Sequence, residues 1–234
     1  IYKSNDSMKK HIECVLNLNL VDVEKIKSKK IKVVVDAVNS TGGLIVPDFL
    51  KELNIEVIKL YCEPNGDFPH NPEPLKKNLT ELSKKVIECN ADLGIAVDPD
   101  VDRLVFVCED GELFGEENTL VACADYVLSK TPGTTVSNLS SSRALNDITK
   151  KHNQVHYYSA VGEVNVVDKM KKCKAVIGGE GNGGVIYPES HYGRDSIVGI
   201  GLFLSLYVQR GLIASKLLET FPKYFMVKEK INLS

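Results

Sequence analysis

A run of mostly β-branched residues, IKVVVDA at 31–37, sets the strongest constraint on the fold. Such a strand is apolar on both faces, so it must be covered on both faces, as in a parallel sheet between two layers of helices. The turn residues NSTGG follow, and residues 44–53 then have the pattern of a helix. A buried strand that continues through a turn into a helix predicts a βαβ unit.

The same alternation continues along the first half of the chain. Further strands are expected at 55–60 and 92–98, and further helices at 75–88, behind Pro74, and at 116–128. Between the strand at 92–98 and the helix at 116–128, the segment RLVFVCEDGELFG predicts a hairpin that turns at Asp-Gly.

The pattern restarts after SKTPGTT, which has the composition of a linker. Strands are expected at 135–139, 155–159, 174–179 and 185–188, with helices at 142–151, 163–172 and 195–208. The predicted fold is therefore α/β: two similar three-layer αβα modules, each a mostly parallel sheet with helices on both faces. We place two domains, at 8–130 and at 131–234.

The segment DPDVDR at 98–103 concentrates charge directly after a buried strand. In an extended segment alternate side chains share a face, so Asp98, Asp100 and Asp102 would lie about 7 Å apart or less. Carboxylates this close repel one another unless a cation lies between them, and an all-oxygen donor set suits Mg²⁺. A solvated acidic turn is the alternative. Arg103 would either complete a cationic site for a phosphoryl group or form a simple ion pair with an aspartate.

The same segment partly matches a calcium-binding EF-hand loop. The three aspartates and Glu109 occupy positions one, three, five and twelve of such a loop. Position six should be glycine but is Arg103, and strands flank the segment where the motif needs helices. The sequence excludes an EF-hand.

The glycine-rich stretch GGEGNGG at 178–184 formally matches G-x-G-x-x-G. A dinucleotide fingerprint must begin a helix, but VIYP follows here, so that interpretation fails. Glu180 and Asn182 can hydrogen-bond vicinal hydroxyls, which suits a sugar; a solvated turn is the alternative. Both this loop and the aspartate loop follow strands, and ligands of open α/β sheets gather at the carboxyl ends of strands, so the two loops could face one cleft.

Composition narrows the function classes. A net charge of −2 argues against nucleic acid as a partner, and no apolar run is long enough to span a membrane. The six cysteines are scattered, without metal-ligand spacing, which favours small buried reduced thiols and a cytoplasmic location.

These motifs, in this order and at this separation, resemble those of the α-D-phosphohexomutases, the family of phosphoglucomutase, phosphomannomutase and phosphoglucosamine mutase. DPDVDR is similar to the magnesium loop of that family, and GEGNGG to its sugar-recognition loop. Further similar stretches are VNSTGG, NPEPL, SSSRAL, VGEVNV and YGRD. Asn182 and Gly184 replace the usual serine and histidine, as in the branch written G-E-x-N-G-G.

The resemblance covers only the second and third of the four family domains, which implies a metal-binding domain at 8–130 and a sugar-binding domain at 131–234. It implies that the three aspartates hold Mg²⁺, that Arg103 steadies the phosphoryl group, and that Glu180, Asn182 and, more weakly, Glu163 bind the sugar. The phosphorylated serine of the family would lie in the missing first domain, and the missing fourth domain would hold the substrate phosphate. PHNPEP at 69–74 only mimics the serine motif. Arg194 and Asp195 are expected to fix the start of the last helix.

The implied reaction interconverts hexose 1-phosphate and hexose 6-phosphate through phosphoserine and a hexose bisphosphate. The fragment alone is expected to be inactive, because the serine is absent. Two alternatives remain: a Mg²⁺-dependent phosphate-ester hydrolase, and a non-catalytic module that binds sugar phosphates.

Overall fold

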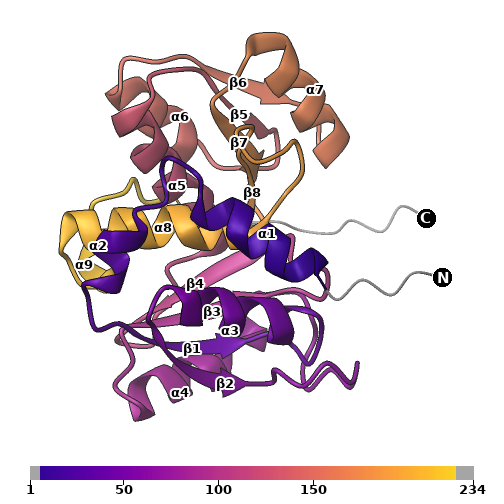
Figure 1. Ribbon diagram of the computed structural model, residues 1–234. Helices are drawn as coiled ribbons and strands as arrows, with labels where there is room; N and C mark the ends of the chain where they lie inside the picture. Colours follow the sequence, from indigo (N-terminus) through magenta and orange to yellow (C-terminus); the bar gives the residue numbers. More distant parts are fainter. Residues whose placement is uncertain (1–5, 225–234) are drawn as a thin grey trace.

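The computed structural model describes residues 6–224, which form two modules built on the same plan (Figure 1). Each module contains a four-stranded sheet, ordered β2-β1-β3-β4 in the first and β6-β5-β7-β8 in the second. The strands of the first sheet are β1 (Lys32–Asp36), β2 (Glu56–Leu60), β3 (Leu93–Val97) and β4 (Leu104–Cys108). Those of the second are β5 (Thr135–Asn138), β6 (His156–Ser159), β7 (Ile177–Glu180) and β8 (Gly184–Ile186). The repeated α/β plan expected from the sequence is confirmed.

Each sheet is mixed in the same way. β1 is parallel to β2 and β3, and β5 is parallel to β6 and β7. The last strand of each sheet, β4 or β8, runs antiparallel to its neighbour. The connection into each last strand is therefore a short loop, and these two loops are the aspartate loop (98–103) and the glycine loop (181–183). Strands flank both loops, which excludes an EF-hand at the aspartate loop and a dinucleotide-binding fingerprint at the glycine loop.

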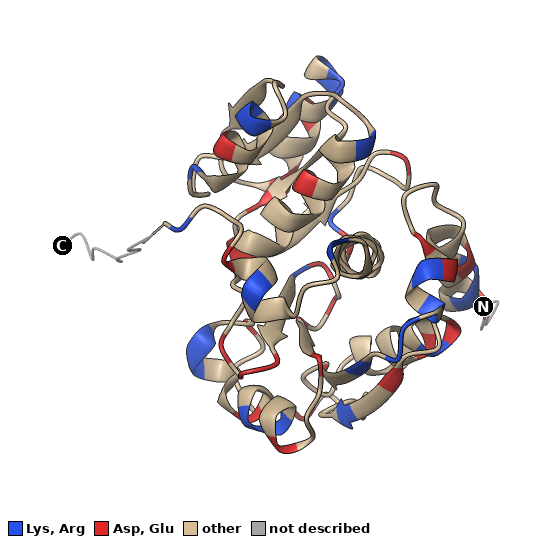
Figure 2. Cartoon of the chain, turned by 90° about the vertical axis from the view of Figure 1, so that its left-hand side faces the viewer, with Lys and Arg blue, Asp and Glu red and all other residues tan. Residues whose placement is uncertain are grey.

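Helices surround both sheets. They are α1 (Ser7–Leu16), α2 (Val23–Lys27), α3 (Gly42–Glu52), α4 (Thr80–Glu88), α5 (Glu116–Lys130), α6 (Ala144–Lys151), α7 (Glu163–Cys173), α8 (Ser196–Arg210) and α9 (Ala214–Leu218). Basic and acidic segments are interspersed on the helices of both modules (Figure 2). No helix among residues 6–224 has the length and apolar character needed to cross a membrane.

Three local expectations need correction. The helix expected at 75–88 is divided into a 3-10 turn (Lys76–Asn78) and α4, with Leu79 between them. The second arm of the expected hairpin is reduced to a single bridge between Val107 and Leu113. Of the six cysteines, which are all free thiols, only Cys108 and Cys123 are buried.

Two long helices lie between the sheets and join the modules. In α8 every residue from Ser196 to Leu206 is buried, and α5 is buried from Thr119 to Leu128. A helix that is apolar on all sides must be covered on all sides, which explains the central position of α8 in Figure 1. One hydrophobic core runs through both modules. The predicted division at residue 130 stays a prediction.

Phe203 of α8 is a central contact of this core. Its ring stacks on Phe106 of β4 with centroids 3.7 Å apart, and meets Phe114 edge to face at 5.0 Å. All three rings are fully buried. Because Phe203 follows the second sheet in the chain while Phe106 belongs to the first, this stack holds the modules together.

Phe203→Ala is expected to lower the free energy of unfolding of the chain by about 3–5 kcal/mol, because it removes aromatic contacts and leaves a cavity. Urea unfolding followed by circular dichroism would measure the change. Leu212→Ala, at an exposed position just beyond α8, is the control and should change stability by less than about 1 kcal/mol. Equal effects of the two substitutions would contradict the central role of the stack.

His156 makes stability depend on pH. Its Nδ1 lies 2.8 Å from Thr135 Oγ1 and its Nε2 lies 3.1 Å from Ser137 Oγ. Burial, with a smaller effect from Lys150, lowers the pKa of His156 to about 4. Below pH 6.5 the unfolded chain therefore takes up a proton that the folded chain takes up only near pH 4, so acidification favours unfolding.

Wild type should thus lose about 1–2 kcal/mol more stability than His156→Gln between pH 7 and pH 5. Urea titrations at both pH values would measure this difference. Tyr157→Phe, on the same strand, should keep the wild-type pH dependence. If wild type and His156→Gln show parallel pH profiles, His156 is not the acid-sensitive group.

Candidate functional site

The aspartate loop is a tight turn between β3 and β4. Asp98 is buried, and its Oδ1 accepts hydrogen bonds of 3.0 Å from the backbone amides of both Asp102 and Arg103. Val101 turns the chain with a left-handed φ of 62°. The loop therefore curls around the Asp98 carboxylate. The predicted convergence of the three aspartates is correct, but its expected cause, an extended segment, is wrong.

The three carboxylates converge closely enough to hold a metal ion. Asp98, Asp100 and Asp102 each offer one oxygen, and these oxygens lie within 4.8 Å of one another. Burial raises the pKa of Asp98 to about 7; the hydrogen bond from the Arg103 amide opposes this rise, and the charges of Asp102 and Asp100 add to it. Burial also raises the pKa of Asp102, against the opposing charge of Arg194. A bound cation would relieve this mutual repulsion.

Arg103 lies beside these carboxylates. Its Nε is 3.7 Å from Asp98 Oδ2 and 4.0 Å from Asp102 Oδ1, and its Nη1 donates a 3.1 Å hydrogen bond to Glu73. The simple ion pair considered from the sequence is therefore present. Nε is nevertheless buried without a hydrogen-bond partner among residues 6–224. Nε therefore hydrogen-bonds neither carboxylate, while the Arg103 side chain as a whole is 31% exposed.

The glycine loop connects β7 to β8 and directly follows Glu180, the last residue of β7. Oε1 of this buried side chain accepts hydrogen bonds from Asn138 Nδ2 at 2.6 Å and from the Gly162 amide at 3.3 Å. Oε2 accepts from Arg194 Nη1 at 2.8 Å and from Asn182 Nδ2 at 3.4 Å. Glu180 therefore holds four surrounding donors in place through both of its oxygens. Asn182, by contrast, is only half-buried.

The two loops touch each other directly. The Leu104 amide, at the end of the aspartate loop, donates a 3.2 Å hydrogen bond to the Gly183 carbonyl, and the Ser196 amide donates one of 3.0 Å to the Val101 carbonyl. Gly183 has a φ of +88°, and a Cβ there would lie 2.3 Å from the Leu104 carbonyl oxygen. A side chain at this position would push the loops apart.

Arg194 is the residue that connects the charged groups of both loops. Its Nη2 pairs with Asp102, its Nη1 with Glu180 at 2.8 Å, and its Nε lies 3.4 Å from Glu163 Oε2. The Arg194 backbone amide also donates to Glu163 Oε1 at 3.0 Å. The side chain is only 14% exposed. Three of the predicted site residues, Asp102, Glu163 and Glu180, therefore pair with one guanidinium that is largely withdrawn from water.

The sequence prediction for Arg194 and Asp195 was half right. Asp195 caps α8, since its Oδ1 accepts from the amides of Ile197 at 2.8 Å and Val198 at 3.1 Å. Arg194 instead points back to the loops. The missed signal was Gly184, because a Cβ there would lie 2.3 Å from Arg194 Cδ. The glycine that replaces the usual histidine of the sugar loop thus makes room for Arg194.

The chain is similar in sequence to proteins of one family. Residues 9–111 match the family described as phosphoglucomutase/phosphomannomutase, alpha/beta/alpha domain II, and residues 116–224 match alpha/beta/alpha domain III. A phosphoglucomutase/phosphomannomutase of Thermococcus kodakarensis is 36% identical over 97% of this chain and 50% of its own length. A probable phosphoglucosamine mutase of Methanopyrus kandleri is 32% identical over 94% of this chain and 50% of its own length.

Solved structures agree with these matches. The crystal structure of a phosphoglucomutase/phosphomannomutase family protein from Burkholderia thailandensis superposes with a TM-score of 0.84 at 26% identity, covering 95% of this chain and 48% of that one. The chain belongs to the phosphoglucomutase/phosphomannomutase family. It spans about half the length of the relatives it matches.

Arg194→Ala is expected to lower the free energy of unfolding by about 3 kcal/mol, because it leaves Glu180 buried without its cation and removes the cation that Asp102 and Glu163 share. Loss of the opposing charge raises the pKa of Asp102 further above its unfolded value, so the deficit should grow as pH rises from 5 to 8. Urea unfolding at these two pH values measures both effects. Arg143→Ala, at an exposed arginine, is the control. A deficit independent of pH would show that Arg194 acts through packing alone.

Proposed function

We propose that this chain is the central part of a phosphohexomutase, which interconverts hexose 1-phosphate and hexose 6-phosphate through a phosphoserine and a bisphosphate intermediate. The observation that carries this proposal is the double contact of Arg194, with Asp102 in the aspartate loop and Glu180 beside the glycine loop. It brings residues suited to a phosphoryl group next to residues suited to sugar hydroxyls. Relatives named as mutases support the general kind of reaction.

Asp98, Asp100 and Asp102 would hold Mg²⁺. The donor set fits, because it consists only of carboxylate oxygens within 4.8 Å of one another, and amide hydrogen bonds fix the Asp98 carboxylate from behind. When bound, the ion would supply positive charge next to the transferring phosphoryl group. Asp102 now pairs with Arg194, so its carboxylate would be shared between that guanidinium and the metal.

Arg103 would donate to a phosphoryl oxygen from its guanidinium, because the side chain lies beside the aspartates and is 31% exposed. A fixed guanidinium spreads the charge that develops on the transferring group without having to move during the reaction. The serine that carries the phosphoryl group would belong to another domain of the intact protein. Hexose phosphate and hexose bisphosphate are the proposed ligands.

Asn182 and Glu163 would contact the sugar hydroxyls, together with Glu180. Asn182 is half-buried, and the Glu163 side chain is 34% exposed, so a ligand can reach both. Glu180 already accepts hydrogen bonds at both oxygens. A sugar hydroxyl would therefore have to share or displace one of these donors. Both predicted domain roles, metal binding at 8–130 and sugar binding at 131–234, are part of this proposal.

Asp100→Asn is expected to reduce kcat/KM for mutase turnover by roughly 100-fold or more, because it removes one carboxylate from the proposed metal site. Asp100 is exposed, so the fold should be unaffected. The measurement is a coupled assay on the intact protein with the 1-phosphates of glucose, mannose and glucosamine, Mg²⁺ and a bisphosphate activator. The sugar with the highest kcat/KM identifies the preferred substrate.

Asp110→Asn is the matched control. Asp110 is also exposed, and its Oδ1 accepts from the Glu112 amide at 3.0 Å, a role that asparagine can keep. It should retain wild-type turnover. Net release of phosphate without isomerisation would support the hydrolase alternative. Binding of sugar phosphate with neither reaction would support a non-catalytic module, and robust turnover by the 234-residue chain alone would contradict a serine located outside it.

A further inference from the structure

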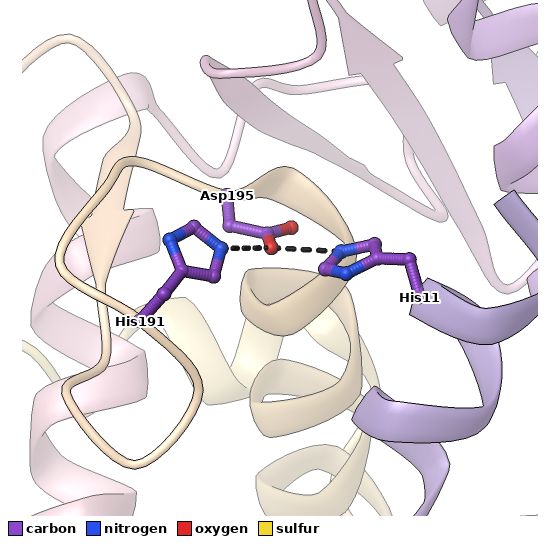
Figure 3. Close-up of side chains that lie close together, drawn as sticks. All are labelled: His11, His191 and Asp195. Carbon is purple, nitrogen blue, oxygen red and sulfur yellow. Dashed lines mark hydrogen bonds and ion pairs between the residues drawn. The ribbon is translucent and has the colours of Figure 1, made fainter. Parts of the chain in front are cut away.

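A second cluster of metal-binding side chains lies outside the aspartate loop. It consists of His11 on α1, His191 in the segment before α8, and Asp195 at the α8 N-cap (Figure 3). His11 Nε2 lies 2.9 Å from Asp195 Oδ2, and His191 Nε2 lies 2.8 Å from the same oxygen. The three donor atoms all lie within 4.8 Å of one another.

The spacing of these atoms is close to that of a metal site. A tetrahedral ion with bonds of about 2.0 Å holds its ligand atoms about 3.3 Å apart. Each histidine nitrogen would need to move about half an ångström away from the carboxylate oxygen to reach that separation. The two nitrogens, which lie within 4.8 Å of each other, would have to adopt the same separation. Figure 3 shows the two imidazoles on either side of the carboxylate, each with its nitrogen directed at the same oxygen.

The surroundings hold the carboxylate in place. Asp195 is buried, and its other oxygen, Oδ1, is occupied by the amides of Ile197 and Val198. The remaining oxygen, Oδ2, contacts both histidines. Hydrogen bonds that orient a carboxylate ligand from behind are typical of metal sites. The side chains of His11 and His191 are 31% and 45% exposed, which gives a cation access from solvent.

The donor chemistry differs from that of the aspartate loop. Imidazole nitrogens favour zinc and other first-row transition metals, whereas oxygen-only sites favour magnesium. Two histidines and one carboxylate leave a fourth position for water, as in open zinc sites. We propose that His11, His191 and Asp195 bind a divalent transition-metal ion of the Zn²⁺ class. The ion joins α1 to the segment that carries Arg194.

The experiment is a zinc titration of the intact protein by calorimetry, with excess Mg²⁺ present to occupy the aspartate loop. Diffraction at the zinc absorption edge then locates the ion. We expect one anomalous peak among the three side chains, and a rise in melting temperature on adding Zn²⁺. His11→Gln and His191→Gln can keep the hydrogen bond to Asp195 but lose the imidazole ligand, so each should weaken zinc binding at least tenfold.

His152→Gln is the matched control. His152 Nε2 forms a similar pair with Asp125 at 2.7 Å, but there no second histidine shares the carboxylate among the described residues. It should leave zinc binding unchanged. Absence of zinc binding, an anomalous peak only at the aspartate loop, or equal affinity in the wild type and the two glutamine variants would overturn the proposal. Mutase turnover is not used as a readout, so this result is independent of the proposed function.

Discussion

The packing of α8 between the two sheets is the constraint on which the site depends. The helix is buried throughout its first eleven residues, and Phe203 stacks on Phe106 of the first sheet. The segment before α8 must therefore pass close to the aspartate loop, where the Ser196 amide meets the Val101 carbonyl. Apolar burial far from the charged groups thus sets the distance between the two loops.

Arg194 balances the charge that this approach creates. Asp102, Glu163 and Glu180 surround a single guanidinium, which is mostly withdrawn from water. Carboxylates so placed would repel one another and carry a desolvation cost without a cation. Two glycines allow the arrangement: Gly183 lets the backbones of the loops touch, and Gly184 leaves room for the arginine side chain. The same arginine therefore holds the two loops together.

Much of this could be predicted from local sequence. The β-branched run at 31–37 and its counterparts identified the strands, and turn residues located both loops. The convergence of Asp98, Asp100 and Asp102 was also predictable, although a turn around Asp98, and not an extended segment, produces it. The role of Arg194 was not predictable, because its partners Asp102 and Glu180 are 92 and 14 residues away along the chain. Nor was the meeting of His11 with Asp195, which depends on α1 packing against α8.

The sequence by itself determined the α/β class, the repeated module, the two loops and their family, because hydrophobic period and turn chemistry act over a few residues. Only the tertiary structure decided which charges share a partner. Contact between distant side chains depends on how α5 and α8 fill the space between the sheets, and that packing is a property of the whole core.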